Sequence, residues 1–168
     1  IREQMDRLEE EGISYEVCPG VSSFCGAAAS LQAEYTLPGI SQTVIITRME
    51  GRTPVPEREK LRSLAAHQST MVLFLSRGLL VQVREELLAG GLAPDTPCAI
   101  CYKATWEDEK IVRGVLDELP ELAERAGIRK TALIVVGKVL ESEYELSRLY
   151  AADFTTEFRQ GRKDEGQK

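Results

Sequence analysis

Apolar runs alternate with amphipathic segments along most of the chain, and this alternation predicts strands separated by helices. The continuous apolar run TMVLFLS, at residues 70–76, is typical of a strand that is buried on both faces. The β-branched side chains of QTVIITR, at residues 42–48, also favour a strand. Further strands are predicted at residues 13–19, 95–104, 110–119 and 131–140.

Helices are predicted where apolar residues recur at helical spacing or where a small-residue segment follows a capping position. Residues 22–33, SSFCGAAASLQA, follow Pro19-Gly20, and Ser22 stands where an N-cap is expected. Residues 120–127 have Pro at the first helical position and Gly just past the end. The remaining helices are predicted at residues 1–11, 58–68 and 78–91.

The alternation of helices and strands predicts an α/β fold with a mixed or mainly parallel sheet flanked by helices. In open α/β sheets, ligands bind beyond the carboxyl ends of the strands. The candidate positions are therefore residues 19–24, 48–53, 75–78 and 103–109. The pattern alone does not show whether these four segments lie together.

Composition narrows the classes of partner. Lys and Arg number 21 against 27 Asp and Glu, a formal net charge of −6, so the chain has no basic surface for a phosphate backbone and nucleic acid is not expected. No apolar run reaches the roughly 18 residues that a membrane span needs, so no membrane partner is expected either.

The cysteine pattern favours structural thiols over a metal site. Cys98 and Cys101 form a CxxC motif, but no second pair or histidine follows at zinc-site spacing, and His67 is the single histidine. Because both cysteines lie in a predicted strand, we expect reduced, packed thiols, no metal and a cytoplasmic setting.

Catalytic motifs are missing from the sequence. It contains no G-x-S-x-G, no Walker A loop and no H-E-x-x-H, and most acidic residues fall where a solvated face is the simpler interpretation. We therefore name no catalytic residue. The loops at the strand ends, with their hydroxyl groups and arginines, suit either an enzyme that positions two reactants or a non-catalytic binding module.

Several quoted segments, taken in order, bring a family resemblance. YEVCPGVSSFCGAAASL, TLPGISQTVIITRMEGRTPVPE, TMVLFLS and CYKATWEDEKIVRGVL resemble the tetrapyrrole methylases, which use S-adenosylmethionine in sirohaem and cobalamin synthesis. SQTVIITR with GRTPVPE, and SRLYAADFTTEFR near the end, are similar to the branch that methylates C11 of precorrin-4 or cobalt-precorrin-4. The alternatives are another branch, such as the uroporphyrinogen-III methyltransferases, or a dimerisation or binding module.

The resemblance implies a division of the chain. Residues 1–38 would be the last helix, strand and helix of an N-terminal donor-binding αβα domain, residues 39–156 the C-terminal tetrapyrrole methylase domain, and residues 157–168 a polar tail. The helix at residues 1–11 starts with apolar positions in phase, without Met or an N-cap, so we expect a piece of a longer protein. Such a piece would lack half of the donor site and would be inactive by itself.

The resemblance also implies roles for individual residues. S-adenosylmethionine, which leaves as S-adenosylhomocysteine, would contact Ser22, Ser23, Leu75, Ala104 and Thr105. The tetrapyrrole substrate would lie along Arg48, Arg52 and Thr53, since guanidinium groups match carboxylates bidentately. Taken without the resemblance, Ser22 is also interpretable as a helix cap alone, and the two arginines as surface charges. A homodimer is implied as well.

Overall fold

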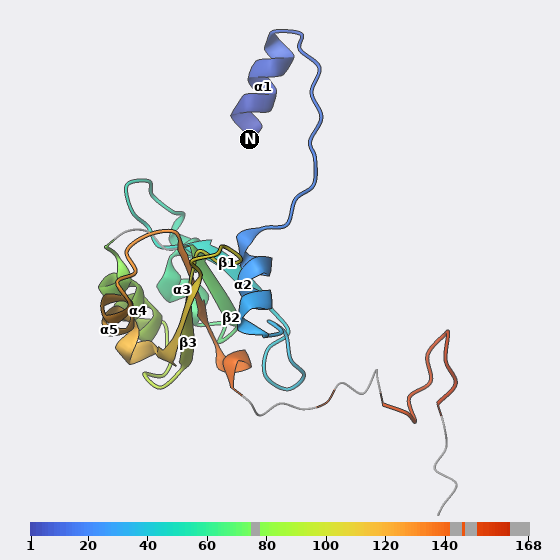
Figure 1. The fold of residues 1–168 in the computed structure, drawn as a ribbon, viewed down its shortest axis with the longest axis vertical. Helices are drawn as coiled ribbons and strands as arrows, with labels where there is room; N and C mark the ends of the chain where they lie inside the picture. The colour runs from blue at the N-terminus through green and yellow to red at the C-terminus, as the bar shows by residue number, and fades with distance from the viewer. Residues whose placement is uncertain (75–77, 142–145, 147–150, 162–168) are drawn as a thin grey trace, which may run out of the picture.

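The computed structural model describes residues 1–74, 78–141, 146 and 151–161, and its centre is a mixed sheet with helices on both faces (Figure 1). The sheet has five strands in the order β1-β2-β5-β3-β4. Their bounds are β1 (Val44–Arg48), β2 (Thr70–Phe74), β3 (Pro97–Tyr102), β4 (Lys110–Val115) and β5 (Ala132–Val136).

The strand directions decide between the two kinds of sheet that the sequence allowed, mixed or mainly parallel. β1 and β2 are parallel, whereas the β2–β5, β5–β3 and β3–β4 pairs are antiparallel, so the sheet is mixed but not mainly parallel. The short connection at residues 103–109 explains the β3–β4 pair, since a parallel return needs a crossover of a dozen or more residues.

Helices are placed largely where the pattern predicts them, with different ends. The predicted helix at residues 58–68 is a short α3 (Leu61–Ala65) after a 3₁₀ turn, η1 (Glu57–Glu59). The predicted strand at residues 110–119 ends at Val115, because the next two N–H groups donate to loop carbonyls and the chain enters η2 (Leu116–Glu118). The others are α1 (Arg2–Glu10), α2 (Ser23–Leu31), α4 (Leu80–Ala89), α5 (Leu119–Ala126) and η3 (Lys138–Leu140).

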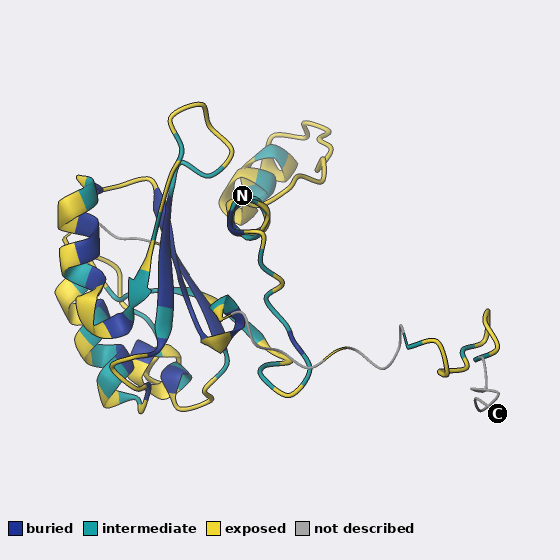
Figure 2. Cartoon of the chain, turned by 60° about the horizontal axis from the view of Figure 1, so that its bottom comes forward, coloured by how far each residue is buried: buried dark blue, intermediate teal, exposed yellow. Residues whose placement is uncertain are grey.

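The core has two parts, one on each face of the sheet. α3, α4 and α5 cover one face and α2 covers the other (Figures 1 and 2). Successive side chains of β2 divide between them: Met71 and Leu73 pack against α3, α4 and α5, and Val72 packs in the cluster that contains α2. This alternation explains why all of β5, and β2 beyond Thr70, are apolar.

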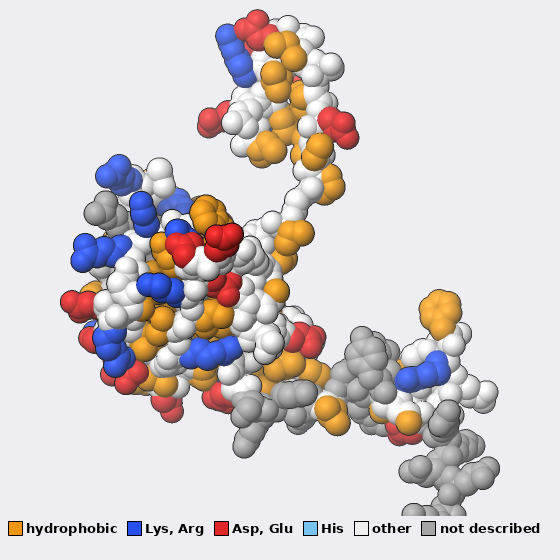
Figure 3. Space-filling model, viewed as in Figure 1, with side chains coloured by type: hydrophobic (Ala, Val, Ile, Leu, Met, Phe, Trp, Pro, Cys, Tyr) orange, Lys and Arg blue, Asp and Glu red, His pale blue; other side chains and the backbone are white. Residues whose placement is uncertain are grey.

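The predicted strand at residues 13–19 is wrong. This segment has no regular structure, and Ile13 and Val17 are 54% and 55% exposed. A strand needs a neighbour for its backbone hydrogen bonds, and none of the described strands pairs with this segment. Figures 1 and 3 show α1 and the following segment extending away from the sheet, with hydrophobic side chains exposed on both.

α1 is held by local contacts. None of its residues is buried against the part of the chain that the structure describes. Arg2 pairs with Asp6, and Arg7 pairs with Glu10 and Glu11, at the spacings that bring side chains together on one helix face. Among all described helices, none is long and apolar enough to cross a bilayer.

Candidate functional site

The loops at one edge of the sheet come together. Arg48 pairs with Phe74 across the parallel strands, and Phe74 and Tyr102 pair with the first residues of β5. The carboxyl ends of β1, β2 and β3 therefore lie at the same edge. Three of the four predicted ligand-binding segments, which start at residues 48, 75 and 103, leave the sheet there, although residues 75–77 lie outside the described part.

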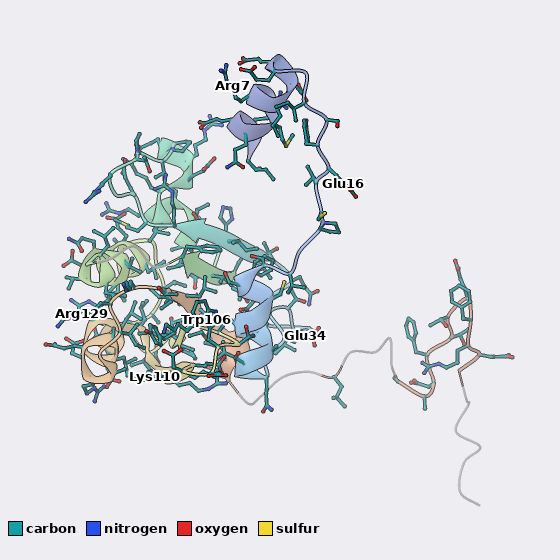
Figure 4. The ribbon with its side chains drawn as sticks, turned by 45° about the horizontal axis from the view of Figure 1, so that its top comes forward. Arg7, Glu16, Glu34, Trp106, Lys110 and Arg129 are labelled. Carbon is teal, nitrogen blue, oxygen red and sulfur yellow. The ribbon has the colours of Figure 1, made fainter. Side chains whose placement is uncertain are left out.

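A pocket of about 230 Å³ lies at this edge, on the face that α2 covers. Ser23, the first residue of α2, forms one wall together with Phe74 at the end of β2. The other walls are formed by Ala104 and Trp106, in the connection between β3 and β4, and by residues 131–133, where β5 begins. Figure 4 shows Trp106 beside α2, from which it is distant in sequence.

The chemistry of the pocket suits part of an aromatic, polar-edged ligand. Phe74, Ala104 and Leu133 provide apolar walls, and Ser23 contributes a hydroxyl group. Small-molecule sites are typically lined in this way, with few polar groups, and span about 300–1,000 Å³. Because the pocket is smaller than that range, it has room for a portion of a cofactor-sized ligand.

The connection between β3 and β4, residues 103–109, is a tightly held loop. Lys103 and Thr105 have φ values of 47° and 71°, a left-handed backbone that non-glycine residues seldom adopt. Lys103 N–H donates to Thr131 O at 2.9 Å, and Lys103 Nζ bonds Asp108. The same ammonium group lies 5.2 Å and 5.3 Å from the ring centroids of Tyr102 and Trp106. These contacts offset the energetic cost of the left-handed backbone at Lys103 and Thr105.

α2 lies close to this loop because its residues are small. A Cβ atom added to Gly26 would be 3.3 Å from Thr105 Cγ2, so glycine permits the approach. At the other end of α2, Arg113 Nη2 donates to Leu31 O at 2.6 Å and satisfies a terminal carbonyl. The C-terminal end of α2 is therefore tied to β4, and its middle lies against the loop.

Glu109 links α2 to the loop; it belongs to the candidate segment at residues 103–109, but the sequence pattern assigned it no role. Its Oε2 atom accepts from Ser30 Oγ at 2.5 Å and from Thr105 N–H at 2.5 Å. The Ser30 hydroxyl, followed by the Thr105 N–H, lowers the pKa of Glu109. In the sequence Glu109 is the last of three consecutive acidic residues that follow Trp106, and such a run is most simply interpreted as a solvated acidic face.

The structure brings together some of the residues expected to hold a cofactor. Ser23 and Ala104 line the pocket, and Thr105 follows Ala104 against Gly26. Ser22 is in the N-cap position with an extended backbone, yet its hydroxyl makes no capping hydrogen bond. Leu75 lies outside the described residues.

The residues expected to contact a substrate lie on the loop after β1. The Arg48 guanidinium donates to the carbonyls of Met49, Thr53 and Pro54 at 3.2–3.3 Å, so it fixes the shape of its own loop. Arg52 and Thr53 are exposed on that loop, and Arg52 takes part in none of the ion pairs found among the described residues.

The CxxC cysteines point to opposite faces of β3, so they cannot bind one ion together. Cys98 packs in the cluster with α3, α4 and α5, and Cys101 in the cluster with α2. Both are free thiols, and burial raises their pKa values to about 12 and about 11. Within the described residues, no group of acidic, cysteine and histidine side chains is arranged to hold a metal.

Comparison of the chain with known proteins identifies a matching family. The family model of the Tetrapyrrole (Corrin/Porphyrin) Methylases matches residues 1–120. A cobalt-precorrin-4 C(11)-methyltransferase from Methanocaldococcus jannaschii is 54% identical over 97% of the chain, which spans only 63% of that relative's length.

Solved structures agree with the sequence comparison. The X-ray structure of a cobalamin biosynthetic enzyme, cobalt precorrin-4 methyltransferase, matches 83% of this chain and 59% of its own, with a TM-score of 0.81 and 50% identity. A uroporphyrin-III C-methyl transferase from Thermus thermophilus, in complex with S-adenyl homocysteine, matches 83% of this chain and 59% of its own, with a TM-score of 0.67 and 26% identity. The chain therefore belongs to the tetrapyrrole (corrin/porphyrin) methylases.

Proposed function

We propose that the protein to which this chain belongs transfers a methyl group from S-adenosylmethionine to C11 of precorrin-4 or cobalt-precorrin-4 in cobalamin biosynthesis. The observation that carries this proposal is the 54% identity to a cobalt-precorrin-4 C(11)-methyltransferase over nearly the whole chain. The likeness to a uroporphyrin-III C-methyl transferase is weaker, at 26% identity, which favours the C11 branch.

The pocket at the sheet edge fits the adenosine portion of the methyl donor. Its apolar walls suit a purine ring, and the Ser22 and Ser23 hydroxyls lie at the start of α2, where they can bond the polar groups of a nucleoside. Ala104 and Thr105 would lie beside the adenine, and Leu75, by its backbone, beside the rest of the adenosine. The solved relative in complex with S-adenyl homocysteine supports a donor site in this family.

S-adenosylmethionine, when bound, supplies an already activated sulfonium methyl group. The work of the chain is then to hold the reactants in line and to exclude water, which requires no acid–base group. The titratable groups that line the pocket agree with this. Burial keeps the Cys101 thiol protonated, and the bond to Asp108 raises the pKa of the Lys103 ammonium group, so neither is placed to act as a base. No catalytic residue is proposed.

The tetrapyrrole is proposed to lie along the loop after β1. Such a substrate has several carboxylates, and the exposed Arg52 can bind one bidentately. Thr53 offers a hydroxyl group beside it. Arg48 acts indirectly, because its guanidinium already holds the loop through the carbonyls of Thr53 and Pro54.

The remaining proposals concern the whole protein. Residues 1–38 would belong to a donor-binding domain and residues 39–156 to the substrate-side domain, as the family resemblance implies, and the chain spans 63% of the length of its relative. The exposed apolar side chains at Ile13 and Val17 support contact with further structure. A homodimer in the cytoplasm is proposed, and the free cysteines suit a reducing compartment.

The test is a methylation assay with the protein expressed from its complete open reading frame. Precorrin-4, cobalt-precorrin-4 and uroporphyrinogen III are each incubated with isotopically labelled S-adenosylmethionine. We expect label at C11 of one of the first two. Label on uroporphyrinogen III alone would move the protein to another branch, and no transfer with detectable tetrapyrrole binding would leave a non-catalytic module.

A further inference from the structure

We propose that Glu109 is a positioning residue that fastens the loop at residues 103–109 onto α2 and so sets the shape of the pocket beside Ala104. The inference rests on the proposed function in one respect, since it takes this pocket to be the adenosine site. The fastening itself is a property of the chain and is tested separately.

The contacts of Glu109 join segments that are far apart in sequence. One carboxylate oxygen, Oε2, accepts from the Ser30 hydroxyl on α2 and from the backbone N–H of Thr105, at 2.5 Å in both cases. None of the ion pairs among the described residues involves Glu109. The neighbouring Lys103 bonds Asp108 instead. Glu109 therefore acts as an acceptor of hydrogen bonds that its charge strengthens.

One face of α2 supplies the matching surface. Ser23, Gly26 and Ser30 are spaced by three and four residues, which places them on the same side of a helix. Ser23 lines the pocket, Gly26 approaches Thr105, and Ser30 bonds Glu109. The two walls of the pocket are thus joined along this face of α2.

The loop needs such a contact because its backbone is unfavourable on its own. Thr105 has a φ of 71°, and a β-branched residue in this region is an outlier that persists only where its surroundings impose it. The hydrogen bond to Glu109 is made by the N–H of this same residue. Removing the carboxylate leaves Thr105 free to relax, and Ala104 and Trp106 on either side move with it.

Trp106 makes this movement measurable. It is the single tryptophan of the 168-residue chain, and it lies in the loop with 61% of its surface exposed. In this chain we expect Glu109→Ala and Ser30→Ala to shift Trp106 emission and to increase its quenching by acrylamide. Glu109→Gln keeps an acceptor oxygen and should return both signals towards wild type. Glu121→Ala removes an exposed acid on α5, which covers the other face of the sheet, and is the control that should change neither.

Binding is measured by calorimetry with S-adenosylhomocysteine, in the protein expressed from its complete open reading frame. We expect Glu109→Ala to weaken binding about tenfold, because the loop loses the charge-assisted hydrogen bond that holds it beside the pocket, and Glu109→Gln to weaken it less. Urea titration shows whether each variant is folded.

The outcomes separate the two proposals. An unchanged Trp106 emission in a folded Glu109→Ala variant overturns the fastening role. An altered emission with affinity within twofold of wild type overturns its effect on the pocket. If the wild-type protein binds no S-adenosylhomocysteine, the proposed function fails, and the fluorescence series alone then decides whether Glu109 positions the loop.

Discussion

Gly26→Ala separates the intrinsic stability of α2 from its contact with the loop. In a helix interior, Ala is more favourable than Gly by about 0.8–1.0 kcal/mol. At this position the new Cβ would be 3.3 Å from Thr105 Cγ2 and 4.0 Å from Ala104 Cβ, whereas carbon atoms pack best at about 3.5–4.0 Å. The loop must therefore shift by a few tenths of an ångström, and part of the propensity gain is lost.

We expect Gly26→Ala to raise the free energy of unfolding by less than about 0.5 kcal/mol and to shift Trp106 emission. Ala29→Gly, at an exposed position of the same helix, is the control and should lower stability by about 1 kcal/mol without moving the emission. Urea unfolding and fluorescence measure the two effects. A full gain of about 1 kcal/mol with unchanged emission would refute a close contact between α2 and the loop.

Three further predictions concern Arg52, Glu109 and the cysteines. Arg52→Ala should raise the KM for the tetrapyrrole about tenfold with little change in kcat, because it removes a charged hydrogen bond that is made equally in the ground and transition states. Arg58→Ala, on the exposed turn η1, is the control and should leave the KM unchanged. The pKa of Glu109 is lowered in the folded state from its ordinary value of 4.5. Its contribution to the free energy of unfolding is therefore present above pH 4.5 and is lost as the pH falls through the folded-state pKa. Glu109→Gln should reduce this loss of stability at acid pH, as measured by urea unfolding. At pH 8 a thiol reagent should modify the two exposed cysteines quickly. Cys98 and Cys101 should react only on unfolding, because burial hides them and raises the pKa values of their thiols. Fast reaction of all four cysteines in the folded chain would contradict the buried positions.

The order of residues along the chain determined most of the local structure. The apolar run at residues 70–76 and the β-branched segment at residues 42–48 predicted β2 and β1, because periodicity and side-chain shape act over a few residues. Pro120 and Gly127 marked α5, and Gly127 has the left-handed φ of 69° that ends a helix. The loops that follow the strands were identified because the ends of the strand patterns mark where each loop begins.

Tertiary structure decided which of these elements are neighbours. The insertion of β5 between β2 and β3, antiparallel to both, brings the ends of three strands to one edge. The segment at residues 13–19 has a strand pattern but no partner among the described strands, so its backbone stays irregular. Ser30 and Glu109 meet for the same reason. Strand pairing and side-chain hydrogen bonds join residues distant in sequence, and no local pattern encodes which residues those are.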